Sequence, residues 1–343
     1  MPQEPITATQ PRPAVARRRR PVLWQPYQPV FWLWLVLTVP STVLLLIDIV
    51  RRTDSIAGLA AATVLVGAQG AALWLLIRAL PRFRRQPLSL GLAALLWGGT
   101  FAIMAAGALN SANSDELDRY GLTTLSASIS APLNEDLLRF LGILVVLVLA
   151  YGRRITVMDG ALYGFLVGAG FELVENLCYA LQSTDVAETL RIGVARLLVG
   201  FALHALWSAF SGAVLAYCLS RTQRRLGGRW LLMIPAILAP MLMHAAWDSP
   251  PLSVIGAVQL LLYLLLYGIT LTLFCCAVAW GRRSEFAWYT ETTGWSGGRR
   301  EFARLPRRER RALAATAIAQ ERDGADPAGT AATGASAAGA AAV

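Results

Sequence analysis

Residues that could do chemistry are concentrated in the middle of the chain, inside stretches that are otherwise apolar. They include the only two histidines of the chain, and the full set is Asn134, Glu135, Asp136, Arg139, Glu172, Glu175, Asn176, His204 and His244. Each histidine is followed four residues later by a further polar residue, Ser208 or Asp248. Such groups can activate a water, stabilise an oxyanion and protonate a leaving amine, which are the needs of peptide hydrolysis.

The elements that must position these residues are membrane-spanning helices. The chain is 56% hydrophobic with a mean hydropathy of +0.51, and one helical span needs about 20 apolar residues. We therefore predict an all-α, polytopic helix bundle with about eight transmembrane helices, at 30–50, 56–77, 88–109, 131–150, 157–181, 197–219, 230–248 and 253–281.

All 31 basic residues are arginine, and their distribution predicts the orientation of the bundle. With the N-terminus inside, the cytoplasmic segments before the tail hold fifteen arginines and the opposite side holds five. This positive-inside bias places both termini in the cytoplasm. It also accounts for the net charge of +10 without a nucleic-acid partner, so the partner we expect for these arginines is the lipid bilayer.

Composition divides the chain into three parts. A basic N-terminal segment (1–29) precedes the bundle (30–281), whose polar motifs lie within 130–248, and a cytoplasmic tail follows (282–343). The Arg-rich first part of the tail has two interpretations, a basic helix on anionic headgroups and a solvated charged segment. Its end, DPAGTAATGASAAGAAAV, is low in complexity and is predicted to be disordered.

The spans that carry the polar residues alternate in direction, and the polar positions alternate with them. Glu135 and His244 each lie about one turn from the outer end of a span, and Glu175 and His204 lie on the order of 10 Å below it. We therefore expect these four residues to meet in the outer half of the bilayer. A charge in a span costs at least ~2.5–3.5 kcal/mol, so such a cluster indicates function.

Helical spacing groups the residues further. Glu135 and Arg139 are four residues apart and can pair, whereas Asp136 is turned about 100° away and can face another partner. A second helix presents three polar residues on one wall: Glu172, Glu175 and Asn176.

Two versions of a hydrolytic site fit these residues. In a metal-free, glutamate-type protease Glu135 is the general base, and His204 and His244 stabilise the oxyanion or protonate the amine. In the other version a divalent metal, with zinc as the first choice, is bound by His204, His244 and Glu175. Sequence leaves both versions open. Asp136 is a further candidate for a catalytic residue. The candidates for supporting residues are Arg139, Glu172, Asn176, Ser208 and Asp248.

The order of these motifs resembles that of the PrsW family of intramembrane proteases, relatives of the CAAX prenyl proteases and the bacteriocin-processing enzymes. The matching motifs are Glu135-Asp136-x-x-Arg139, Phe171-x-x-x-Glu175-Asn176, His204-x-x-x-Ser208 and His244-x-x-x-Asp248. The family pattern prefers Glu-Glu and Lys in the first motif, where this chain has Glu-Asp and Arg. The resemblance implies a hydrolase of the bacterial plasma membrane that cleaves a single-span membrane protein near the outer face, such as an anti-sigma factor.

Two other classes of function use similar residues. Glu and His chains within spans also line the proton or ion paths of transporters, and an inactive relative could use the same cavity as a binding scaffold. Carriers are expected to have inverted repeats with broken spans in matching positions. Here the polar cluster is confined to one half of the bundle, and the first three spans contain only the isolated Asp48 and Gln69. We therefore rank the intramembrane protease first.

Overall fold

The computed structural model describes residues 23–80, 86–150, 154–183, 185–220, 228–249 and 256–324 of the chain. All regular elements within these ranges are helical, and seven of the helices described are long and apolar enough to cross a membrane. The prediction of an all-α, polytopic membrane bundle is confirmed. Helix α5 (Ser126–Leu149) has 24 residues but is not among the seven, because every 18-residue stretch of it contains Glu135, Asp136 and Arg139.

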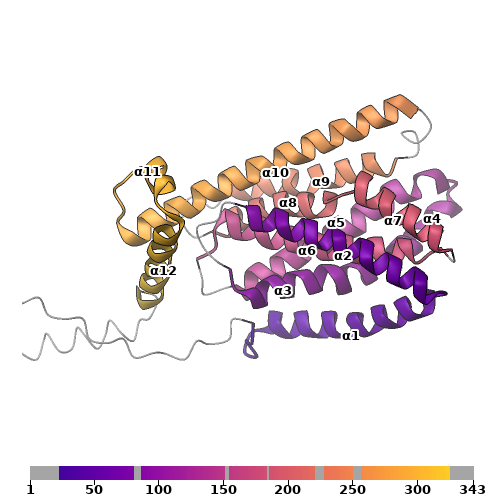
Figure 1. Ribbon diagram of the computed structural model, residues 1–343, viewed down its shortest axis with the longest axis horizontal. Helices are drawn as coiled ribbons and strands as arrows, with labels where there is room; N and C mark the ends of the chain where they lie inside the picture. The colour runs from indigo at the N-terminus through magenta and orange to yellow at the C-terminus, as the bar shows by residue number, and fades with distance from the viewer. Residues whose placement is uncertain are drawn as a thin grey trace, which may run out of the picture.

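The helices run side by side along the long axis of the molecule (Figure 1). Before α5 the order is α1 (Pro29–Arg52), α2 (Ile56–Ala79), α3 (Leu88–Leu96), the π-helical segment η1 (Trp97–Ala102), α4 (Ile103–Arg119) and the short η2 (Thr123–Leu125). After α5 it is α6 (Val157–Ala180), α7 (Val186–Val199), α8 (Leu203–Leu219), the short η3 (Arg229–Leu232), α9 (Met233–Trp247) and α10 (Gly256–Thr293). The total of eight spans and the cytoplasmic position of both termini stay predictions.

The largest departures from the predicted ranges near the site are in the third and sixth spans. The third predicted span, 88–109, continues as α4 to Arg119, and the sixth, 197–219, is interrupted at 200–202. Before that interruption, α7 forms where we predicted a loop. The reason is local: Asp185 caps α7 by accepting a hydrogen bond from the amide of Ala187, and Glu188 lies in the first turn.

Helix α6 is the centre of the bundle. It begins at Thr156 in a capping box, in which the Thr156 amide donates to Asp159 and the Asp159 amide donates to the Thr156 hydroxyl. Its apolar stretch is buried over 83% of its length, and its most extensive packing is against α8. Side chains of α6 therefore face other helices on nearly all sides.

Glycines allow the backbones of α6 and α8 to approach closely. They recur every fourth residue along one face of α6, at Gly160, Gly164 and Gly168. A Cβ atom at Gly164 would overlap the carbonyl oxygen of Ser208, and one at Gly168 would overlap that of His204. Small residues at this spacing are typical of tight helix contacts in membranes. This contact fixes the register of α8, and thereby of His204, against α6.

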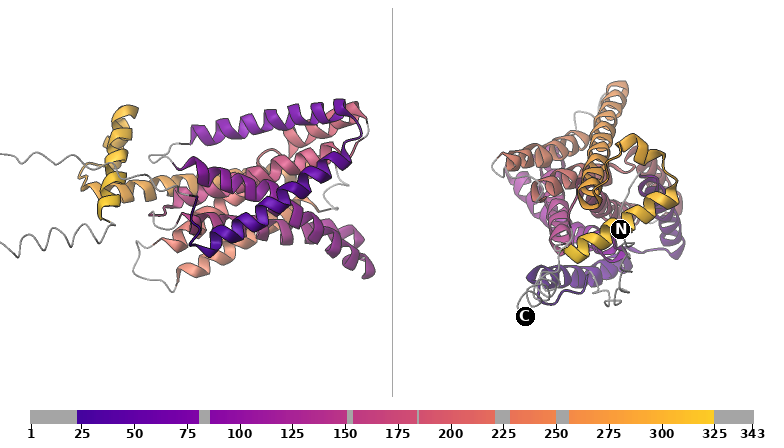
Figure 2. Two further views of the ribbon diagram at one scale, coloured as in Figure 1. Left: turned by 90° about the horizontal axis from the view of Figure 1, so that it is seen from below. Right: turned by 90° about the vertical axis from the view of Figure 1, so that its left-hand side faces the viewer.

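The C-terminal part of the described chain folds back as two further helices, α11 (Arg299–Arg304) and α12 (Arg307–Gly324). They lie across the end of α10, at the end of the bundle opposite to α4 and α7 (Figures 1 and 2). Trp288, Tyr289 and Phe302 are buried there in a small aromatic cluster. The predicted boundary at 282 falls within α10, which continues to Thr293. The Ala- and Gly-rich end at 326–343 and most of the predicted N-terminal segment lie outside the described residues.

The α6–α8 contact predicts the effect of one added methyl group. Gly164→Ala should destabilise the protein by about 1–3 kcal/mol, since a Cβ there must push α8 away. The matched control is Gly67→Ala on α2, where a Cβ would meet no atom within 4 Å. Thermal unfolding of the purified protein in detergent measures both variants. Equal Tm values for the two would contradict the assigned contact.

Candidate active site

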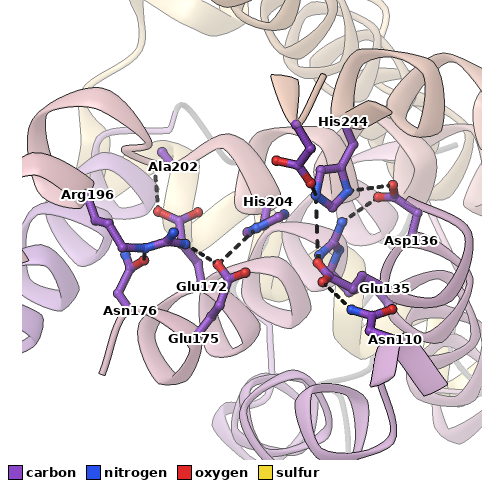
Figure 3. Close-up of polar contacts among 12 residues, drawn as sticks. Asn110, Glu135, Asp136, Glu172, Glu175, Asn176, Arg196, Ala202, His204 and His244 are labelled. Carbon is purple, nitrogen blue, oxygen red and sulfur yellow. Dashed lines mark hydrogen bonds and ion pairs between the residues drawn. The ribbon is translucent and has the colours of Figure 1, made fainter. Parts of the chain in front are cut away.

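Four helices bring the predicted residues to one end of the bundle. Glu135 comes from the first half of α5, Glu175 from the last turns of α6, His204 from the first turn of α8 and His244 from the last turn of α9. Because neighbouring helices alternate in direction, these positions coincide, and the side chains converge (Figure 3). The ring centroids of the two histidines are 5.1 Å apart. The four residues therefore converge as predicted, while their position in the outer half of the bilayer stays a prediction.

Glu135 is a buried carboxylate whose two oxygens have different neighbours. Its Oε1 accepts a hydrogen bond of 3.0 Å from the side-chain amide of Asn110 on α4. Its Oε2 lies 3.5 Å from a guanidinium nitrogen of Arg139 and 3.8 Å from Nε2 of His244. The predicted pairing with Arg139 is present. The oxygen that faces the histidines is thus Oε2.

Asp136 contacts His244, a partner on another helix, as its position on α5 allowed. Its Oδ2 lies 3.1 Å from Nδ1 of His244, and its Oδ1 accepts a 2.5 Å hydrogen bond from Arg139. Arg139 therefore bridges both carboxylates, and its contact with Asp136 is the shorter one. The other ring nitrogen of His244, Nε2, lies 3.3 Å from Oδ2 of Asp248. Asp136 on one ring nitrogen thus sets the orientation of the ring, and the other nitrogen points toward the carboxylates of Asp248 and Glu135.

His204 lies in an aromatic setting and retains a free ring nitrogen. Its Nε2 is 3.2 Å from Oε2 of Glu175, while its Nδ1 is buried and has no hydrogen-bond partner among the described residues. Phe171 and Trp207 pack edge-on against the ring, with centroids 5.3 and 5.6 Å away. Ser208 is buried on α8, but no hydrogen bond between its hydroxyl and His204 is found in the part of the chain described. Of the two predicted supporting residues at this spacing, Asp248 contacts its histidine.

Glu172, Glu175 and Asn176 of α6 form one wall, as predicted. Gln69 and Arg196, which are not among the predicted site residues, hydrogen-bond to this wall. Gln69 of α2 donates to Glu172 (2.6 Å) and accepts from Asn176 (2.8 Å). Arg196 of α7 donates to Glu175 at 2.5 Å and also to Asn176. Gln69 looks isolated in the sequence because its partners lie on another helix, over 100 residues away. Arg196 falls in a predicted loop, because the sequence pattern does not predict α7.

The interruption between α7 and α8 places His204 at the start of a helix. Ala202 adopts a left-handed conformation (φ 65°), the one non-glycine residue with positive φ among those described. Its amide donates a 2.6 Å hydrogen bond to Glu172, which satisfies a donor at the first turn of α8. On the other side, the hydroxyl of Tyr267 on α10 donates to the carbonyl of Val199 at 2.7 Å. The irregular backbone is thus held by protein groups, as a membrane interior requires.

The converging side chains line a cavity of about 580 Å³. Helices α4 to α10 all contribute to its wall, with small residues on α5 and aromatic side chains on α8, α9 and α10. The charged or ionisable side chains in the wall are Glu135, Glu172, Glu175, Arg196, His204, His244 and Asp248. The cavity is large enough for part of a peptide chain beside a water.

The residues present fit a divalent metal ion. One ligand atom each from Glu135, His204 and His244 lies within 4.8 Å of the others, and all three residues are buried. The free Nδ1 of His204 and the Asp136 carboxylate behind His244 are further features expected of such a site. The structure groups Glu135 with the two histidines, whereas we had expected Glu175 as the third ligand. Glu175 instead pairs with Arg196 and His204.

Arg139 is the buried cation on which two of these carboxylates depend, and its removal provides a test. Its side chain is 1% exposed, contacts Glu135 and Asp136, and stacks over the ring of Phe171 at 4.7 Å. Arg139→Leu should destabilise the protein by about 3–5 kcal/mol, because it leaves buried acids without their counter-charge.

The matched control for this substitution is Arg119→Leu, which removes an exposed ion pair with Glu116 on α4. We expect its Tm to stay near that of the wild type, since exposed pairs contribute little. Thermal unfolding in detergent compares the two variants. A Tm for Arg139→Leu as high as that of the control would show that the buried charges need no guanidinium.

Comparison with known proteins agrees with the site. The sequence model of one family, described as PrsW family intramembrane metalloprotease, matches residues 86–276, which is more than half of the 343 residues. Searches of curated proteins and of solved structures found no match. The matched range contains all the site residues described above except Gln69. The chain is therefore a multi-pass membrane protein that belongs to the PrsW family of intramembrane proteases.

Proposed function

We propose that this protease hydrolyses a peptide bond of a single-span membrane protein near the outer face of the bilayer, with Glu135 activating the water. The observation that carries the proposal is the convergence of Glu135, His204 and His244, from three helices, within 4.8 Å. A general base and two imidazoles at that separation can surround one water and one carbonyl group.

Each group has a role that follows from its contacts. Oε2 of Glu135 accepts a proton from the water as its oxygen bonds to the carbonyl carbon, and the carbonyl oxygen becomes an oxyanion. His244, oriented by Asp136, donates a hydrogen bond to that oxyanion. The proton held by Glu135 then passes to the amide nitrogen, the C–N bond breaks, and an amine and a carboxylic acid leave. Glu175, itself paired with Arg196, orients His204 beside this centre, where its imidazole donates a second hydrogen bond to the oxyanion.

A divalent metal is compatible with the same residues. Glu135, His204 and His244 would hold it, and when bound such an ion, with zinc as the first choice, supplies Lewis acidity that activates water and polarises a carbonyl. The description of the family as a metalloprotease supports this version. Asp136 would then act behind His244 by fixing its ring, as it does in the metal-free version.

The proposed substrate is a membrane-anchored protein cut at the membrane surface, such as an anti-sigma factor. The site residues lie toward one end of the bundle, and the arginine asymmetry supports this end as the outer one. A substrate helix that unwinds at this level could place an extended segment in the cavity, whose wall offers small residues at Ala127 and Ala131 and aromatic ones at Trp247 and Tyr263. We propose that this membrane is the bacterial plasma membrane.

Substitution of the three central residues tests the assignment. Glu135→Gln should lower kcat for cleavage of a single-span substrate in proteoliposomes by about 10²–10⁴-fold, because it removes the base but keeps the shape. His204→Ala and His244→Ala should each have a comparable effect.

The matched control is Glu188→Gln on α7, an exposed carboxylate that pairs with Arg191, and its kcat should equal that of the wild type. Wild-type cleavage by Glu135→Gln would contradict the proposal. Glu135-dependent proton flux in the same liposomes, without cleavage, would instead support the transporter alternative.

Removal of metal distinguishes the two versions of the mechanism. In the metal version chelation abolishes cleavage and zinc restores it, because the Glu, His, His set and its supporting carboxylate match a zinc site. Elemental analysis should find about one zinc per wild-type chain and much less in His244→Ala. Full activity in protein free of metal would establish the glutamate-type version instead.

A further inference from the structure

Two asparagines connect α4 to the proposed general base. Asn110 of α4 and Asn134 of α5 are half-buried, and Asn110 lines the cavity. The side-chain amide of Asn110 donates to Oε1 of Glu135 at 3.0 Å, and that of Asn134 donates to Oδ1 of Asn110 at 2.9 Å. Figure 3 shows Asn110 directly beside Glu135, on the side away from the histidines. The chain of hydrogen bonds therefore runs from Asn134 through Asn110 to the carboxylate.

This chain defines the direction in which the Asn110 amide points. A carboxamide has one acceptor oxygen and one donor nitrogen, and the donor of Asn134 occupies the oxygen of Asn110. The nitrogen of Asn110 must then face Glu135. Asn134 thus selects the amide orientation that can donate to the carboxylate.

The two oxygens of Glu135 therefore have different contacts and different roles. Oε1 is held by a neutral donor, while Oε2 faces Arg139 at 3.5 Å and His244 at 3.8 Å. A carboxylate with one fixed oxygen cannot rotate freely about its last bond. The other oxygen is then kept in the geometry needed to receive a proton or to bind an ion.

We infer that Asn110 is a positioning residue: it holds Oε1 of Glu135, so that Oε2 stays directed at the reacting centre. Asn134 acts by orienting Asn110. This inference rests on the proposed role of Glu135. It assigns a function to the extension of α4 beyond residue 109, which carries Asn110 to the cavity wall. A contact that only tied α4 to α5 would affect stability but would leave the rate of the chemical step unchanged.

The test compares cleavage kinetics in proteoliposomes for variants of both asparagines. Asn110→Asp keeps the size of the side chain but replaces the donor with a carboxylate that faces Glu135. We expect kcat to fall about ten- to hundredfold, with KM unchanged, as for other groups that orient a functional side chain. Asn134→Ala should give a smaller loss of kcat. We also compare Asn110→Ala with the double variant Asn110→Ala/Asn134→Ala. The two should have the same kcat, because Asn134 acts through Asn110.

The matched control is Ser111→Ala, since the neighbouring Ser111 is exposed and its hydroxyl donates to the carbonyl of Gly107 on its own helix. It should have the kcat of the wild type. If Asn110→Asp does not fold, Asn134→Ala still tests the inference, because it leaves Asn110 in place.

Wild-type kcat for Asn110→Asp, or a wild-type kcat for a folded Asn134→Ala, would overturn the inference. So would losses that multiply in the double variant. The proposed function fails separately, if Glu135→Gln cleaves normally. An inactive Glu135→Gln together with a fully active Asn110→Asp would therefore remove this inference and leave the proposed function intact.

Discussion

The burial of charge within the bundle is the constraint on which the rest of the site depends. Arg139 is almost fully inaccessible, and it is tolerated because Glu135 and Asp136 both contact it from its own helix. Those acids in turn face His244, which draws α9 against α5. The same set of charges that stabilises the bundle therefore also assembles the candidate active site.

Close packing of the helix backbones also positions the site residues. The glycine face of α6 lets α8 approach closely, and the left-handed residue Ala202 caps the start of α8 just before His204. Glu172 accepts the amide of Ala202 and is itself bound by Gln69 of α2. His204, in the first turn of α8, also contacts Glu175 of α6 and the ring of His244 on α9, which limits how far it can move from Glu135.

Much of this could be read from the sequence, because the strongest signals are local. Apolar stretches of 20 residues identify spans, and the i, i+4 spacing of Glu135 and Arg139 correctly gave their pairing. The contacts that were missed join residues distant in sequence. Gln69 and Arg196 find their partners only when α2 and α7 pack on α6, and Asn110 lies just beyond the predicted end of its span. The rotation about α5 predicts that Asp136 can face another partner, but it does not identify His244 of α9 as that partner.

The central claim is that Glu135 on α5 and His204 on α8 act as one unit. A double-mutant cycle on kcat measures this directly, using Glu135→Gln, His204→Ala and the double variant in proteoliposomes. Residues of one catalytic unit are strongly non-additive, so the double variant should be about as slow as the slower single variant. If the two losses instead multiply in full, the residues act independently, and the account of a single reacting centre is contradicted.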